Sequence, residues 1–179
     1  MKAHVFAEGS NTTAEDRDLP LVEYYEGLFG TVAGLQEELA DHTDTTLHVL
    51  SEEFGAARGH ERVADLETRG TPVGFEEMTA AAREELRGAA TDADVMVVLL
   101  STDVFEMTVG EAWPDLVEAA KPGSIWCLSA ARSALEELDL EALETDGRTV
   151  LTYERRGVAR IGTETREQLL ETVTQTATQ

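Results

Sequence analysis

The feature that most constrains the fold of this chain is a series of short apolar runs that alternate with helical patterns. The clearest run, residues 95–100 (VMVVLL), contains no polar residue. A continuous apolar run of this kind is typical of a strand in a parallel sheet that is covered by helices on both faces. Four other segments are also expected to be strands: residues 4–7, 47–50, 125–128 and 149–153.

Helical patterns lie between these runs. We expect helices over residues 21–39 (with Pro20 before the first turn), 76–90, 133–138 and 164–174, and one that starts or is kinked at Pro114 and ends at Lys121.

Two further segments are less regular. Residues 157–162 are expected to return as a sixth, edge strand, whereas the Gly-rich segment 54–75 is expected to be a functional loop or to hide a short element. The alternation predicts a single α/β domain over residues 1–174, a three-layer Rossmann-like architecture with a mostly parallel sheet of five or six strands. Residues 175–179 are expected to fray.

The chain is strongly acidic, with a formal net charge of -22 on 179 residues. The acidic residues are spread along the chain, and Lys2 and Lys121 are the only lysines. A surface of this kind repels itself unless salt screens it, which predicts a halophilic protein of a cytoplasm with molar salt. Extended nucleic-acid binding is disfavoured, because contacts to phosphates need basic patches.

Several other classes of protein lose support. Met1-Lys2 leads directly into a strand pattern, so no signal peptide is expected, and no apolar run is long enough for a membrane span. The single Cys127 excludes an internal disulfide and a Cys-rich zinc site. The sequence contains no G-x-G-x-x-G, G-x-x-x-x-G-K-[ST], H-E-x-x-H or G-x-S-x-G motif.

A serine follows or ends each of the first four predicted strands. In an open parallel α/β sheet, ligands bind at the carboxyl ends of the strands, and helix N-termini at that edge favour anions. Asn11 extends the first of these turns. Helix capping is the more common role of a serine in such a place. The residues concerned are Ser10, Ser51, Ser101 and Ser129.

Basic residues also follow predicted strands, which is notable in so acidic a chain. Arg58, His60 and Arg62 follow the second strand, Arg132 follows the fourth, and Arg155-Arg156 follow the fifth. At the serine edge, Arg58 and Arg132 would bind a phosphate or carboxylate. The alternative is that each arginine pairs with a nearby carboxylate, as Arg58 with Glu61.

Carboxylates at strand ends are the candidates for acid–base chemistry. Glu8 and Glu52 are preferred as base or nucleophile because each follows an apolar strand, and His60 is the preferred proton carrier. Asp103 is a candidate ligand-binding residue. Glu8, Glu52 and Asp103 could together hold a divalent ion, but their spacing defines no metal site, and the sequence identifies no cofactor.

Two stretches resemble a group of small prokaryotic α/β domains of unknown function. They are Tyr25-x-x-x-Phe29 and the segment 47–55 (LHVLSEEFG), in which a strand ends in a Ser-x-x-x-Gly turn. The turn of that group after the first strand contains Cys-Ser, where this chain has Glu8-Gly9-Ser10. The resemblance implies no activity, but it supports Ser51 and Gly55 as residues at the edge of a site.

Two functions are therefore expected. The first is binding of a small anionic ligand, a nucleotide or nucleoside derivative, at the carboxyl edge of the sheet, with transferase or hydrolase activity if the protein is an enzyme. The second is a non-catalytic interaction domain in which the segment 55–75 docks a protein partner and Trp113 is an exposed anchor.

Overall fold

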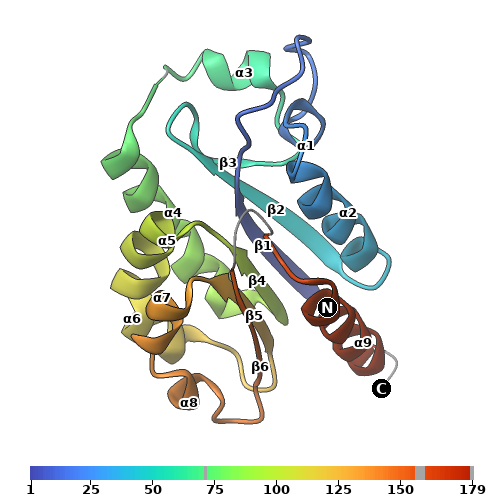
Figure 1. Cartoon of the computed structure of the whole chain (residues 1–179), viewed down its shortest axis with the longest axis vertical. Coiled ribbons are helices and arrows are strands. Elements are labelled where there is room, and N and C mark those ends of the chain that lie inside the picture. The colour runs from blue at the N-terminus through green and yellow to red at the C-terminus, as the bar shows by residue number, and fades with distance from the viewer. Residues whose placement is uncertain (71, 156–159, 178–179) are drawn as a thin grey trace.

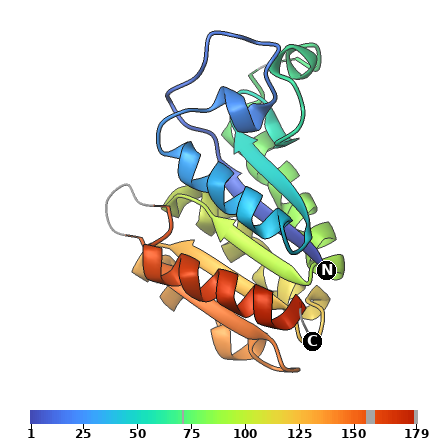
Figure 2. The same ribbon diagram turned by 90° about the vertical axis from the view of Figure 1, so that its right-hand side faces the viewer.

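The chain folds into three layers, in which one six-stranded sheet lies between two layers of helices (Figures 1 and 2). The computed structural model describes residues 1–70, 72–155 and 160–177. The predicted fold class, a Rossmann-like α/β domain with a mostly parallel sheet, is confirmed.

The strand order is β3-β2-β1-β4-β5-β6, and every neighbouring pair is parallel except β2 with β3. The central strand β1 pairs with β2 on one side and β4 on the other, so the direction of strand addition reverses there. In open α/β sheets this reversal leaves a crevice at the carboxyl ends of the two strands. The strands are β1 (Lys2–Glu8), β2 (Asp44–Ser51), β3 (Gly55–Arg58), β4 (Val95–Leu99), β5 (Ile125–Ala130) and β6 (Thr149–Glu154).

Five of the six strands lie close to the predicted positions, but the remaining strand is not the predicted edge strand 157–162. It is β3, which comes from the segment 54–75, expected to be a functional loop or to hide a short element, and it runs antiparallel to β2. Ser51 and Gly55 form the turn: the Ser51 hydroxyl accepts from the Phe54 amide at 3.0 Å, and Gly55 has a φ of 73°, which favours glycine. Of the predicted edge strand 157–162, residues 157–159 lie outside the described residues, and 160–162 form no strand.

Helices cover the two faces unequally. On one face lie α1 (Leu21–Tyr24), α2 (Phe29–Ala40), α3 (Val63–Glu67) and α9 (Thr163–Ala177). On the other lie α4 (Phe75–Asp92), α5 (Thr102–Phe105), the π-helical η1 (Glu106–Gly110), α6 (Glu111–Ala119), α7 (Arg132–Glu136) and α8 (Leu140–Leu143). Figure 2 shows α2 and α9 side by side on the first face.

The core is divided by the sheet into two clusters. Successive strand residues point to opposite faces, so Val5 and Ala7 pack under α2 and α9 while Phe6 packs under α4. All five residues of β4 are buried, as the apolar run predicts.

The helix predicted over residues 21–39 is broken into α1 and α2. Between them, Tyr25 is extended and bridges to Thr13, the Glu26 amide donates to the Thr12 carbonyl at 2.8 Å, and Gly27 has a φ of 66°. Backbone groups that would continue the helix are thus bonded to the preceding polar loop.

The helix predicted around Pro114 begins earlier. Residues 102–119 form α5, η1 and α6 in succession, and Pro114 lies inside α6. Proline lacks the amide that would bond to Gly110, four residues before it, where η1 ends. At the other end of the chain, α9 continues to Ala177, past the predicted end at residue 174. Among the described residues, no helix has the length and apolar content needed to cross a membrane.

Candidate functional site

A cleft of about 660 Å³ opens at the carboxyl ends of β1, β2 and β4. It lies where the direction of strand addition reverses, which is the position expected for a ligand site in this class of fold. Three groups of residues line it: carboxylates (Glu8, Glu52, Glu53, Asp103), other polar or glycine residues (Gly9, Ser10, Asn11, Thr13, Ser51, Ser101), and aromatic or apolar residues (Tyr24, Tyr25, Leu50, Phe75, Met78, Val104).

Glu8 is the carboxylate held most firmly in this cleft. It ends β1, and its Oε1 accepts a hydrogen bond from the Ser101 hydroxyl at 2.6 Å and another from the Ser101 amide at 3.3 Å. Ser101 is positioned by the start of α5, directly after β4. Oε2 of Glu8 has no hydrogen-bond partner among the described residues, so one carboxylate oxygen is oriented and the other is available to a ligand.

Arg160 lies behind Glu8. Its Nη1 donates to the Glu8 carbonyl at 3.0 Å, and its guanidinium lies 6.0 Å from the centre of the Phe29 ring. Burial lowers the pKa of Arg160; the Glu8 charge acts in the opposite direction, and Arg155 lowers the pKa further. The sequence predicts Arg160 in an edge strand and gives it no role, because its partner Glu8 lies 152 positions away in the sequence.

Tyr25 forms part of the wall of the cleft. Its ring lies against Gly9, where a Cβ would come within 2.4 Å of the ring atoms. Burial raises the pKa of Tyr25 to about 12, the hydrogen bond with Ser51 partly opposes this, and the charge of Glu53 adds to it. The phenol therefore stays neutral near pH 7 and can donate a hydrogen bond.

The predicted ligand-binding residues of the first two strand ends lie at the cleft, but some have structural partners. The Ser10 hydroxyl lies 2.8 Å from the carbonyls of both Thr12 and Glu26 and ties the loop to the α1–α2 break. Asn11, Glu52 and Asp103 also line the cleft, and their side chains are exposed.

Ser129, the fourth of the predicted serines, lies away from the cleft. It is fully buried in β5, and its hydroxyl donates to the Arg160 carbonyl. Ser129 therefore holds the segment that carries Arg160, instead of lining the cleft.

The basic residues predicted for this edge do not meet there. Because β3 runs back along β2, Arg58 lies opposite His48 and donates to Glu85 at 3.1 Å. Arg132 is 74% exposed on α7 and pairs with Glu136 at 2.8 Å. Both residues therefore fit the alternative expectation, that each arginine pairs with a carboxylate.

Of the four other basic residues expected after predicted strands, the structure describes three: His60, Arg155, and Arg62, which directly precedes α3. His60 is exposed and lines a different, smaller cavity of about 240 Å³ together with Arg58. Arg155 follows β6, where its amide donates to the Ala130 carbonyl at 2.9 Å. Arg156 lies outside the described residues.

The cleft is consequently negative. Four carboxylates line it, and none of the described lining residues is Lys, Arg or His. Among the described residues, no group of three or more His, Cys, Asp or Glu side chains could hold a metal ion, so Glu8, Glu52 and Asp103 do not form such a group.

The predicted protein-docking features differ from expectation. Trp113 is only 7% exposed, and its indole N–H donates to the Asp139 carbonyl at 3.3 Å, so it is a core residue and not an exposed anchor. The segment 55–75 contains β3 and α3, which are short elements of the kind expected as the alternative to a functional loop.

Comparison with known proteins assigns no family. No protein-family model matches the chain, and a search of curated proteins gives no match. The resemblance to small prokaryotic α/β domains stays a prediction, and the function must be inferred from the cleft.

Proposed function

We propose that the cleft binds a small polar ligand of the nucleoside class and that Glu8 is its main polar contact. The observation that carries this proposal is the fixed Glu8 carboxylate, with one free oxygen, at the point where the direction of strand addition reverses.

The charge of the cleft favours a nucleoside over a nucleotide. A phosphate placed among Glu8, Glu52, Glu53 and Asp103 would be repelled, and no described lining residue offers it a cation. An uncharged ligand with hydroxyl or amino groups donates to carboxylates instead. Of the ligands expected from the sequence, the nucleoside derivative therefore has the better support, and an anionic one has less.

The shape and lining of the cleft support the same class. Its volume of about 660 Å³ falls within the range of small-molecule sites. The buried Met78 and Tyr24 and the half-buried Phe75 offer apolar surface for a flat base. Hydroxyl groups of a sugar can donate to Glu8 and accept from the neutral Tyr25 phenol.

If the protein is an enzyme, the same arrangement suits transfer or hydrolysis at the sugar–base bond. A carboxylate fixed through one oxygen can act through the other as nucleophile or general base. Glu8 fits this role better than Glu52, because Glu52 is exposed and its carboxylate has no described partner that would orient it.

The test is ligand-dependent thermal stability, measured in about molar KCl to screen the negative surface. We expect nucleosides to raise the melting temperature of the wild-type protein, and the corresponding monophosphates to raise it less. Glu8→Gln keeps an oxygen that can accept from Ser101 and should weaken nucleoside binding about tenfold or more.

The matched control is Glu164→Gln, which removes one negative charge from an exposed position on α9, away from the cleft. This variant should bind nucleosides as the wild type does. Equal stabilisation by monophosphates and nucleosides, or no stabilisation by any nucleoside, would contradict the proposal. A positive result justifies an assay for release of the free base, with Glu8→Gln as the inactive variant.

A further inference from the structure

The strand β6 forms one edge of the sheet, away from the cleft. It ends the row of strands beyond β5, and no other strand among the described residues pairs with it (Figure 1). It is as long as β5, and its pairing with β5 runs without interruption from Thr149 to Glu154. A strand edge of this kind is a template on which a further strand can pair.

The backbone of β6 has hydrogen-bonding groups that point away from β5. The amides of Thr149 and Arg155 donate to carbonyls of the neighbouring segment, at 3.0 Å and 2.9 Å respectively. In a parallel ladder, the residues that bond to one neighbour alternate with those that point away from it. The odd-numbered residues therefore bond to β5, and the N–H and C=O groups of Val150 and Thr152 point outward.

Apolar side chains on both faces of β6 are only partly buried. Val150 on one face and Leu151 and Tyr153 on the other keep some exposed surface, whereas every residue of β4 and β5 is buried. On the Val150 face, a groove of about 410 Å³ lies between β6 and the segment from α7 to α8. Three leucines contribute to its lining: Leu135, Leu138 and Leu140. A further strand beside β6 would bury apolar surface on both faces of the sheet.

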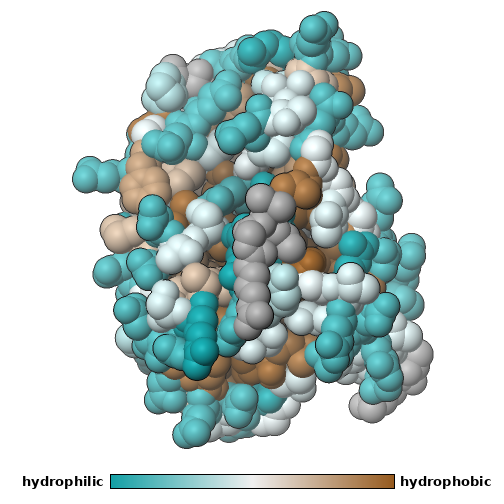
Figure 3. All heavy atoms as spheres, viewed as in Figure 1, coloured by the Kyte–Doolittle hydropathy of each residue, from teal (hydrophilic) through white to brown (hydrophobic). Residues whose placement is uncertain are grey.

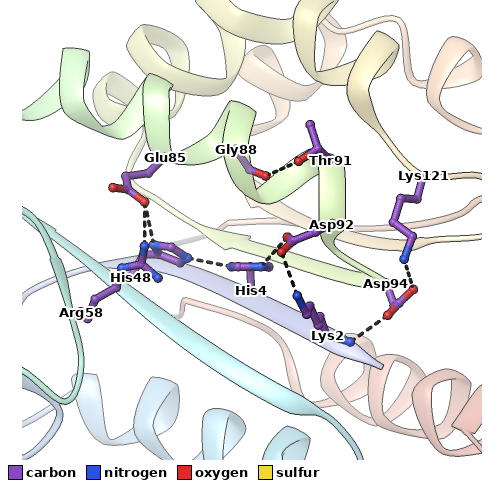
Figure 4. Close-up of polar contacts among 10 residues, drawn as sticks. All are labelled: Lys2, His4, His48, Arg58, Glu85, Gly88, Thr91, Asp92, Asp94 and Lys121. Carbon is purple, nitrogen blue, oxygen red and sulfur yellow. Dashed lines mark hydrogen bonds and ion pairs between the residues drawn. The ribbon is translucent and has the colours of Figure 1, made fainter.

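The opposite edge of the sheet is protected against such pairing. β3 has only four residues, and the last of them, Arg58, donates to Glu85 of α4 at 3.1 Å (Figure 4). Short strands and charged side chains are features that keep sheet edges from associating. In contrast, β6 contains no lysine, arginine or proline, and its one charged residue, Glu154, lies at its end. Of the two edges, β6 is therefore the one suited to pairing.

We propose that the β6 edges of two copies of this chain pair antiparallel about a two-fold axis, which joins their sheets into one. In this register, Val150 of each copy exchanges both backbone hydrogen bonds with Thr152 of the other. The two Leu151 residues lie opposite each other at the axis, as a non-hydrogen-bonded pair, and cover each other on the α9 face. Each Thr149 lies opposite Tyr153 of the second copy.

Charge supports this register and a second copy as the partner. Arg148, directly before β6, comes opposite Glu154 of the second copy, so positions of opposite charge are matched at both ends. The Arg148 guanidinium donates to the Ala120 carbonyl at 2.6 Å and so supplies a charge that is held in place. With the axis at Thr152 instead, Glu154 would lie opposite the apolar Val150. The sequence of β6 is thus complementary to itself, and the interface is independent of any ligand in the cleft.

The first test is the mass of the protein in solution, measured by light scattering over a dilution series in about molar KCl, which screens the repulsion between two acidic copies. We expect the mass of two chains for the wild type. Thr152→Pro removes an outward amide, a change that an edge strand tolerates, and should weaken the dimer about tenfold or more. Thr152→Val keeps the amide and should remain a dimer. The melting temperature of each variant checks that it is folded.

Disulfide trapping tests the register and does not depend on the proline variant. Non-hydrogen-bonded neighbours in an antiparallel pair have Cα atoms about 4.5 Å apart, within reach of a disulfide. Leu151→Cys should therefore give a covalent dimer on mild oxidation. Thr149→Cys is the matched control on the same face of β6 and should not, because it lies opposite Tyr153. Cys127 is fully buried and does not compete.

Three results would overturn the proposal. They are a wild-type mass of one chain throughout the dilution series, a dimer equally stable in folded Thr152→Pro, and cross-linking of Thr149→Cys as efficient as that of Leu151→Cys.

Discussion

Gly9 illustrates how one missing side chain shapes the cleft. The ring of Tyr25 occupies the space where a Cβ would be, and Glu8 and Ser10 on either side keep their positions because the ring can approach the backbone. The sequence marks Gly9 as part of a turn, but the reason for glycine lies in a residue of a later element.

Gly9→Ala should therefore destabilise the protein. The added Cβ would lie 2.4 Å from the Tyr25 ring, so the ring or the strand end must move, and we expect a loss of about 1–3 kcal/mol in the free energy of unfolding. Urea denaturation measures the change. Gly88→Ala is the control, because it lies inside α4 with nothing within 4 Å of the added atom and should stabilise by about 0.5–1 kcal/mol. Equal stability of Gly9→Ala and the wild type would show that the ring is not held there.

His48 should make stability depend on pH. Burial lowers its pKa from 6.5 to about 3, so between these values the unfolded chain binds a proton that the folded protein does not. The stabilising effect is complete above about pH 6.5 and is lost as the pH falls. From about pH 7 to about pH 5 we expect a decrease of about 2 kcal/mol in the free energy of unfolding.

His48→Phe separates this effect from the other titrating groups. The variant keeps a ring against Phe6 but has no group that titrates, so its stability should decrease less over the same range of pH. The free energy of unfolding of both proteins is measured by urea denaturation at each pH, and the quantity compared is its slope against pH. A wild-type slope no steeper than that of His48→Phe would refute the assignment.

Among the elements, those specified by local pattern were predicted and those specified by distant contacts were not. The apolar run of β4 and the helical composition of α4 are local, and both elements were expected close to where they lie. By contrast, β3 is a strand of four residues without an apolar run, and it forms because Ser51 and Gly55 turn the chain back onto β2. The displacement of Arg58 from the expected site follows from this one hairpin.

The break between α1 and α2 gives a prediction at the same scale. Gly27 has a φ of 66°, which an L side chain rarely adopts, so Gly27→Ala should destabilise the protein by about 1 kcal/mol. Gly30 lies in the first turn of α2 and has no positive φ, and a Cβ added there meets nothing within 4 Å. Gly30→Ala should therefore be neutral or slightly stabilising. Thermal unfolding of both variants measures the difference. A result in which the two substitutions had equal effects would mean that the break does not depend on Gly27.

For the whole molecule, charge is the dominant property. The net charge is -22, and hydrophilic side chains cover most of the face shown in Figure 3. Several of the few cations are already paired with carboxylates, as Arg17 is with Glu67 and Lys121 is with Asp94. The remaining negative charges repel one another more strongly in the folded protein than in the expanded chain.

Salt should therefore stabilise the protein. Raising KCl from about 0.1 M to about 1 M shortens the screening length from about 10 Å to about 3 Å, and we expect the melting temperature to rise steeply over this range. An equal osmolality of sucrose should raise it less, because sucrose screens no charge. A melting temperature that does not change with KCl would contradict the prediction of a halophilic protein.

The location of the candidate site could be predicted from the sequence, but its charge could not. The strand ends carry Glu8, Ser51 and Ser101 in the order of the chain, and parallel strands bring them to one edge. Which arginines reach that edge depends on side chains and loops far apart in the sequence. Arg58 and Arg132 do not, whereas Arg160 contacts Glu8 from behind.

The bond between Arg160 and Glu8 has a consequence for the synthesis of the protein. It joins residues 152 positions apart, so β1 emerges from the ribosome long before the side chain that supports its end. Most of the sheet can assemble on a nascent chain, but this side of the cleft is completed only when the segment before α9 has been translated. A nascent chain arrested after β6 should therefore hold Glu8 less rigidly than the released protein does.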